Sequence, residues 1–282
     1  MPDAFGLVAI VTKIALYLGV LTSAGTVMAT LLFGLVRTRG LTLVFAICGL
    51  FATIIAFSLR GANLTGDVSG MTDPEMLGLL WNTPVGTALL LRLVGLSLLI
   101  MGLFMGRAGI WLSVLGGLIA IWSFDHVGHI SGRDTMLLDL ALMLHLLAIA
   151  LWIGVLTPLK RLASSSNTYA TAADVGHRFG IIASVTVPVL IIVGGYMGYQ
   201  LAGSFSALIG TGYGQALIIK VLLVGGLVGL AAANKLRFIP ALRSGDPVAA
   251  KHLSNSLSVE WLFILAVLST TAVLTTHLTL PT

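Results

Sequence analysis

The sequence predicts an all-α polytopic membrane protein, and two features of its composition lead to that class. Hydrophobic residues make up 57% of the 282 residues, whereas charged residues make up only 9%. A soluble domain carries roughly 25% charged residues to cover its water-facing surface. The apolar residues also occur in runs of about 20, the length that an α-helix needs to cross the hydrocarbon core of a bilayer.

Eight of these runs are predicted to be membrane-spanning helices, with the lipid bilayer as their partner. In chain order they cover approximately residues 5–36, 41–60, 85–106, 108–124, 136–159, 177–200, 213–235 and 254–278. The first run is too long and lacks the basic leader of a cleavable signal peptide, so we expect it to be a spanning helix.

The few charged residues are distributed between the loops in a way that predicts orientation. Ten of the 15 basic residues lie after the first, third, fifth and seventh predicted helices or open the sixth: Arg37, Arg39, Arg107, Lys160, Arg161, Arg178, Lys235, Arg237, Arg243 and Lys251. The opposite side holds six acids: Asp3, Asp67, Asp73, Glu75, Asp125 and Asp134. The positive-inside rule then places the basic loops in the cytoplasm and both termini outside. The net charge of +5 is therefore interpreted as an orientation signal and does not indicate a nucleic-acid partner.

The first four and last four predicted helices are related by a weak internal repeat. Residues 83–92 (TPVGTALLLR) and 211–220 (TGYGQALIIK) open the third and seventh helices with the same pattern of Thr, Gly, Ala, Leu and a terminal cation. A shift of four helices preserves direction, so the pattern predicts a parallel four-plus-four repeat. Its halves are residues 1–124 and 125–282, within one membrane unit.

Four histidines on the predicted outer side are candidate metal ligands. His126 and His129 lie where the fourth helix emerges, and His277 ends the eighth. His145 lies nine residues after Met136, roughly 13 Å inside the fifth helix at ~1.5 Å per residue.

Methionines add sulfur ligands on the same side, with Met136 on the fifth helix and Met197 on the sixth. Imidazole binds several transition metals, and thioether sulfur selects Cu(I). The single cysteine, Cys48, argues against a structural zinc site. The mixture of His and Met therefore favours copper.

Ionisable residues inside the predicted helices are functional candidates because burying them in a membrane is costly. Lys13, Arg92 and Lys220 lie at similar depths, and Asp139 and Glu260 are the acids of a possible ion path. The cations could be helix anchors or could hold anionic lipid headgroups. They could also hold the propionates of a haem, so a haem-binding electron-transfer protein stays open as an alternative.

Several ordered segments of the second half resemble the copper resistance D (CopD) family of bacterial inner-membrane proteins. The resemblance covers about residues 125–262 and rests on Gly128-His129, His145-Leu146-Leu147-Ala148, Trp152-Ile153-Gly154, Arg178-Phe179, Thr211-Gly212-Tyr213-Gly214, Lys220, Asn234 and Ser258-Val259-Glu260.

The resemblance implies copper handling across the bacterial inner membrane, with uptake from the periplasm towards the cytoplasm. The outer side that the charge distribution predicts for both termini is then the periplasm. It identifies His129 and His145 as the family-like histidines and a small periplasmic copper-binding protein of the CopC type as the partner. A copper-holding assembly factor without transport is the second alternative. The sequence contains no nucleotide-binding motif, and we expect no enzymatic activity.

Overall fold

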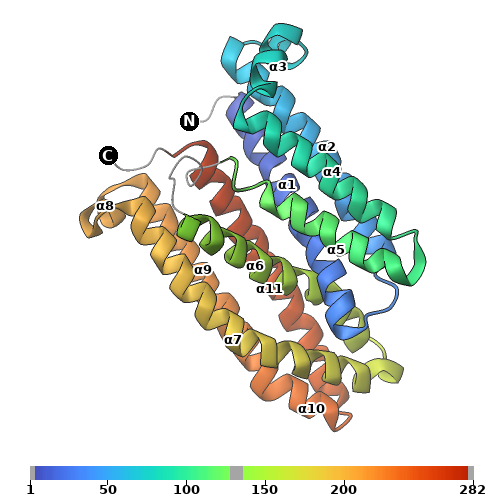
Figure 1. Ribbon diagram of the computed structural model, residues 1–282. Helices are drawn as coiled ribbons and strands as arrows, with labels where there is room; N and C mark the ends of the chain where they lie inside the picture. Colours follow the sequence, from blue (N-terminus) through green and yellow to red (C-terminus); the bar gives the residue numbers. More distant parts are fainter. Residues whose placement is uncertain (1–3, 128–135, 279–282) are drawn as a thin grey trace.

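The structure is a computed structural model that describes residues 4–127 and 136–278. Within these residues the chain is helical and forms no β-strand (Figure 1). The long helices are α1 (Ala4–Phe33), α2 (Arg39–Thr65), α4 (Pro84–Gly102), α5 (Gly106–Trp122), α6 (Met136–Ala163), α7 (Tyr169–Ala202), α9 (Gly212–Ala233) and α11 (Pro247–Thr276). The short helical segments are η1 (Val68–Met71), α3 (Pro74–Trp81), η2 (Ser166–Thr168), α8 (Phe205–Gly210), the π-helical turn η3 (Asn234–Phe238) and α10 (Ile239–Arg243).

Seven helices of the described chain are long and apolar enough to cross a membrane. The helix α5 is apolar as well, but it has 17 residues. At ~1.5 Å per residue it is roughly 25 Å long, slightly less than the ~30 Å of a hydrocarbon core. The predicted class, a helical protein with several membrane-spanning helices, is confirmed. The number of eight crossings stays a prediction.

Two helices begin earlier than their apolar runs predict. The helix α7 begins at Tyr169 instead of residue 177, and α11 begins at Pro247 instead of residue 254. The added turns of α7, residues 169–176, are rich in alanine and contain Asp174, whose carboxylate lies 3.7 Å from Arg178 one helical turn further on. Such pairs favour helix at an exposed site. Hydropathy misses these turns because they extend beyond the apolar segment.

Polar residues and prolines set the starts of several helices. The helices α3, α4 and α11 each begin with proline, and the preceding Asp73, Thr83 and Asp246 accept hydrogen bonds from backbone N–H groups of the first turn. At the first position of a helix a backbone N–H has no acceptor within the helix, so proline, which has no N–H, loses nothing there. The short polar side chain before it accepts hydrogen bonds from the N–H groups that follow. These signals place the loops where the helices must turn.

The two halves of the molecule meet where α1 crosses α6. A Cβ added to Gly25 would overlap the backbone of Ala150, and one added to Gly154 would overlap the backbone of Gly25. Small residues permit such close approach between membrane helices. Buried side chains of α1, α5, α6 and α11 form one core around this crossing. Figure 1 shows α2 and α4 on one side of this core and α7 and α9 on the other.

The start of α1 and the end of α11 lie at the same end of the molecule, which we call the terminal end (Figure 1). The Nζ of Lys13 donates a hydrogen bond of 2.9 Å to the carbonyl oxygen of Thr275. The segment α10 lies at the opposite end. The side of the membrane that the terminal end faces stays a prediction.

The starts of α4 and α9 share a local geometry. Each follows a short helix and is capped by a threonine side chain. A Cβ on Gly86 would overlap the backbone of Trp81 in α3, and a Cβ on Gly214 would overlap that of Leu208 in α8. Glycine thus lets each short helix fold back against the spanning helix. This likeness is consistent with the predicted four-plus-four repeat, which stays a prediction.

Replacing Gly154 by alanine is expected to destabilise the protein, because the new methyl group would force α6 away from α1. Overpacking of this kind costs about 1–3 kcal/mol or more. Gly225→Ala in α9 is the matched control, since a Cβ there would have no neighbour within 4 Å. Thermal unfolding in detergent measures both variants. Equal midpoints for the two would show that the crossing is not the tight contact described.

Candidate functional site

Two carboxyl groups and an imidazole lie near the terminal end, between α5 and α6. Asp125 and His126 follow α5, Asp139 lies in the first turn of α6, and the two aspartates line the same small pocket. The Oδ1 of Asp125 and the Nδ1 of His126 are buried and have no hydrogen-bond partner. Both atoms could accept a cation. We call Asp125, His126 and Asp139 the entry group.

The electrostatics of the entry group make the Asp125 carboxyl group easier to protonate than an ordinary aspartate. Burial and the neighbouring Asp139 carboxylate raise the pKa of Asp125 above its usual range, while His126 has a smaller opposite effect. Protons therefore compete with a metal ion for Asp125, so the affinity of this carboxyl group for a metal depends on pH.

His145 lies deeper, between three helices. It belongs to α6, and a Cβ on Gly194 of α7 would lie 3.7 Å from its Cε1 atom. Lys220 of α9 interacts electrostatically with the ring. The Nδ1 of His145 is buried without a hydrogen-bond partner. An imidazole nitrogen in that condition is available as a metal ligand.

The structure separates the two methionines of the predicted site. Met197 of α7 is 7% exposed and packs on Leu138 and Ala141 of α6. Ala141 lies one turn from His145, so Met197 and His145 occupy the same α6–α7 interface, with Met197 nearer the terminal end. Met136 is 78% exposed. It lies on the surface of the first turn of α6, away from this interface.

The remaining predicted ligands are not gathered into one site. His277 follows α11 and is exposed, and His129 lies outside the described residues. In the part of the chain that the structure describes, no three His, Cys, Asp or Glu side chains come together as a metal site. The structure therefore offers separate candidate stations at different depths.

Glu260 forms the third polar station. It lies thirteen residues after Pro247, near the middle of α11, because that helix begins earlier than predicted. The Glu260 residue is 2% exposed. Trp152 Nε1 donates to Oε2 at 2.9 Å, and Asn234 Nδ2 donates to Oε1 at 2.5 Å. Both donors are neutral.

Trp152 and Asn234 are site residues that were not among the ligands predicted on the outer side of the membrane. Asn234 begins the π-helical turn η3, and its Oδ1 is buried without a partner. Turns of this kind are frequent at functional sites. A signal was present in the sequence, since a buried carboxyl group requires donors and few polar side chains occur in these helices. Only the packing shows which of them reach Glu260.

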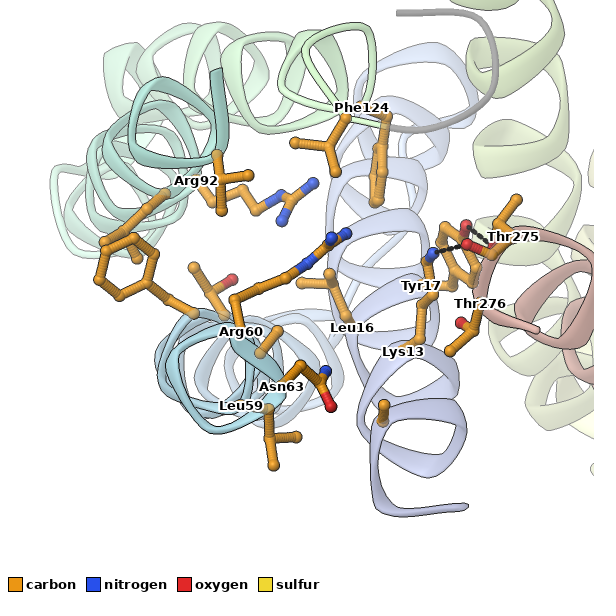
Figure 2. Close-up of a pocket in the computed structure, with 17 residues that line it drawn as sticks. Lys13, Leu16, Tyr17, Leu59, Arg60, Asn63, Arg92, Phe124, Thr275 and Thr276 are labelled. Carbon is orange, nitrogen blue, oxygen red and sulfur yellow. Dashed lines mark hydrogen bonds between the residues drawn. The ribbon is translucent and has the colours of Figure 1, made fainter. Parts of the chain in front are cut away.

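The intramembrane cations are divided between the halves. Lys220 lies near His145, whereas Lys13 and Arg92 line a cavity in the first half together with Arg60 (Figure 2). None of the four lies within ion-pair distance of a carboxylate among the described residues. The second half thus holds the metal-ligand types, and the first half holds a concentration of positive charge.

Comparison with known proteins gives matches in both halves. Residues 1–138 match the family model described as "Copper resistance protein D-like, N-terminal domain", and residues 173–274 match "Copper resistance protein D". A 135-residue stretch is 31% identical to the "Copper transport protein CutJ" of Bacillus subtilis (strain 168) and covers 47% of this chain. It spans 24% of the length of that relative. No solved structure matches the chain.

These matches extend the likeness that the motifs of the second half suggested. The first half matches its own family model, although no motif there was recognised. Met197, Lys220, Asn234 and Glu260 lie inside the second matched segment, whereas His145 lies between the two. Both family descriptions and the relative's name refer to copper, and none of them refers to haem.

Replacing Trp152 by phenylalanine should destabilise the protein, because the change removes a donor to the buried Glu260 carboxyl group and keeps an aromatic ring. An unsatisfied buried acceptor costs about 1–3 kcal/mol. Trp261→Phe is the matched control, since Trp261 Nε1 donates to the neutral Thr157 hydroxyl at 3.2 Å. Chemical unfolding in detergent compares the two. A larger loss in the control would contradict the role given to Trp152.

Proposed function

The chain belongs to the copper resistance protein D family, and from this premise we propose that it carries copper ions across the bacterial inner membrane through its second half. The main support for the proposal is that the Nδ1 atom of His145 is buried among the helices and has no hydrogen-bond partner. A buried ring nitrogen without a hydrogen-bond partner is unfavourable unless a ligand binds to it. Copper is a metal that imidazole binds well.

In the proposed path, copper arrives at the terminal end, which faces the periplasm. We assign the capture of the ion to the entry group (Asp125, His126 and Asp139), whose side chains do not form a preassembled metal site among the described residues. His129 and His277 stay predicted ligands on the same side. The unpartnered Oδ1 of Asp125 and Nδ1 of His126 support this assignment. A periplasmic copper-binding protein of the CopC type would deliver the ion to this surface.

The ion would then pass to His145 and Met197 at the α6–α7 interface. Met197 is buried and one turn nearer the terminal end, so it suits a transfer step between the entry group and His145. Met136, as an exposed side chain, suits capture from solution better than transfer. A thioether favours Cu(I), the softer oxidation state.

Lys220 gives this path a property that transport requires. Its positive charge acts on the His145 ring and would repel a copper ion bound there. An ion conducts only when each site binds it weakly enough to release it. Lys220 therefore favours His145 as a transit station over a permanent store.

Release would occur beyond Glu260, on the cytoplasmic side. The carboxyl group and the unpartnered Oδ1 of Asn234 provide oxygen acceptors midway along α11. We infer movement from the periplasm to the cytoplasm, driven by a gradient or by chelation in the cytoplasm. The relative named as a copper transport protein supports transport as the activity. The proposal assigns no catalytic step to the chain.

His145→Ala should lower copper uptake into sealed proteoliposomes by at least about tenfold, since even outer-shell partners of a metal site contribute 10–100-fold to affinity. His252→Ala is the control, because His252 is exposed and stacks on Phe238 near the start of α11. Uptake is followed by metal analysis of washed vesicles.

Three results distinguish the candidate functions. Unchanged uptake in His145→Ala would contradict the path. Stoichiometric copper binding without uptake by the unaltered protein would favour the assembly factor. A strong Soret band after haem-replete expression would favour the haem protein.

Copper binding to the entry group should weaken as the pH falls, because Asp125, with its raised pKa, takes up a proton that competes with the metal. Asp125→Asn should lower the affinity at neutral pH and flatten its pH dependence. Asp67→Asn is the control, since hydrogen bonds from Ser69 lower the pKa of this exposed carboxyl group. Copper titrations at several pH values provide the measurement. An equally steep pH dependence in Asp125→Asn would refute the assignment.

A further inference from the structure

A cavity of about 170 Å³ lies near the terminal end of the first half. Its walls come from α1, α2, α4 and α11 and from the segment after α5 (Figure 2). The volume is roughly ten times the ~15 Å³ that one water molecule needs. The cavity can therefore hold a group of several heavy atoms.

Three cations from three different helices line this cavity. Lys13 belongs to α1, Arg60 to α2 and Arg92 to α4. Figure 2 shows the guanidinium groups of Arg60 and Arg92 directed into the same space beside Leu16, with Lys13 at its edge near Thr275. Among the residues that the structure describes, no acidic side chain lines this cavity.

The partners of these cations are neutral. Arg92 is 8% exposed, its Nε donates to the Ser123 hydroxyl at 2.8 Å, and its guanidinium carbon lies 4.9 Å from the centre of the Phe124 ring. Lys13 donates to the Thr275 carbonyl oxygen at 2.9 Å. Within the described residues, none of the three cations has a carboxylate within 4.0 Å.

The positive charge of this cavity requires an explanation. Like charges on Lys13, Arg60 and Arg92 repel one another, and the repulsion is strongest where water is excluded, as around the buried Arg92. Helical bundles seldom retain such groups without a partner, because ionisable residues inside a membrane are costly. A bound anion would remove the repulsion.

The available donors fit a tetrahedral oxyanion. The terminal nitrogens of Arg92 and Arg60 point into the cavity, and a guanidinium group matches phosphate oxygens in a two-point geometry. Asn63 and Tyr17 add polar side chains to the lining. A copper ion, by contrast, would be repelled here, so the cavity is not a part of the proposed copper path.

We propose that this cavity binds a phosphate group through Arg60, Arg92 and Lys13. The group can belong to the headgroup of an anionic lipid or to inorganic phosphate, because both present the same oxygens. The cavity lies in the terminal part of the bundle, with Arg60 five residues before the end of α2 and Thr275 one residue before the end of α11. That depth is accessible from the headgroup layer and from water.

The test measures binding to the purified full-length chain in detergent after lipid removal. Native mass spectrometry follows short-chain phosphatidylglycerol, and calorimetry follows inorganic phosphate. The variant Arg60→Gln should weaken binding roughly tenfold to hundredfold, the equivalent of one charged hydrogen bond. Arg60 has no hydrogen bond or ion pair within the described chain, so its replacement spares the fold. Arg92→Gln should have an effect at least as large.

The matched control is Lys251→Gln, which removes one exposed cation near the start of α11 at the other end of the molecule. Binding of phosphatidylglycerol alone identifies a lipid headgroup as the source, and binding of both probes shows that the phosphate group suffices. The proposal is overturned if neither probe binds, or if Arg60→Gln and Lys251→Gln bind equally well. Short-chain diacylglycerol, which has no phosphate, should not bind. If it binds as strongly as phosphatidylglycerol, the proposal is also overturned.

Discussion

The contact between the backbones of α1 and α6 is the constraint on which the rest of the molecule depends. Gly25 and Gly154 leave no room for a side chain, so the two helices cross at the closest approach that backbones permit. Packing in lipid gains little from the hydrophobic effect and relies on such close contact. The crossing joins the two halves and brings the ends of α1 and α11 together, which positions both the cavity and the candidate copper path.

The two halves separate opposite chemistries. The first half gathers Lys13, Arg60 and Arg92 around one cavity, and the second half holds His145 and Glu260 among apolar helices. In the proposed copper path, the ion is repelled by the first set and bound by the second. The separation keeps the proposed path away from the positive cavity, although both lie in one helical bundle.

Much of the fold and part of the site could be predicted from the sequence. Runs of apolar residues located the long helices, and the depth of His145 followed from its distance to Met136. The short helices α3 and α8 were missed, because segments of six to eight residues carry too weak a periodic signal. Met136 was expected to be a metal ligand, but its side chain is exposed. The position of a residue in the sequence does not reveal which face of a helix its neighbours cover.

The sequence by itself determined the membrane class. Composition and the length of the apolar runs decide whether a chain can form helices that cross the bilayer with all their backbone hydrogen bonds made internally. It also identified the residue types that favour copper. Only the tertiary structure decided which polar groups meet. Trp152, Asn234 and Glu260 come from helices far apart in the chain, and each of these contacts depends on helix rotation and crossing. Those quantities arise from the packing of side chains between helices, which a linear pattern does not contain.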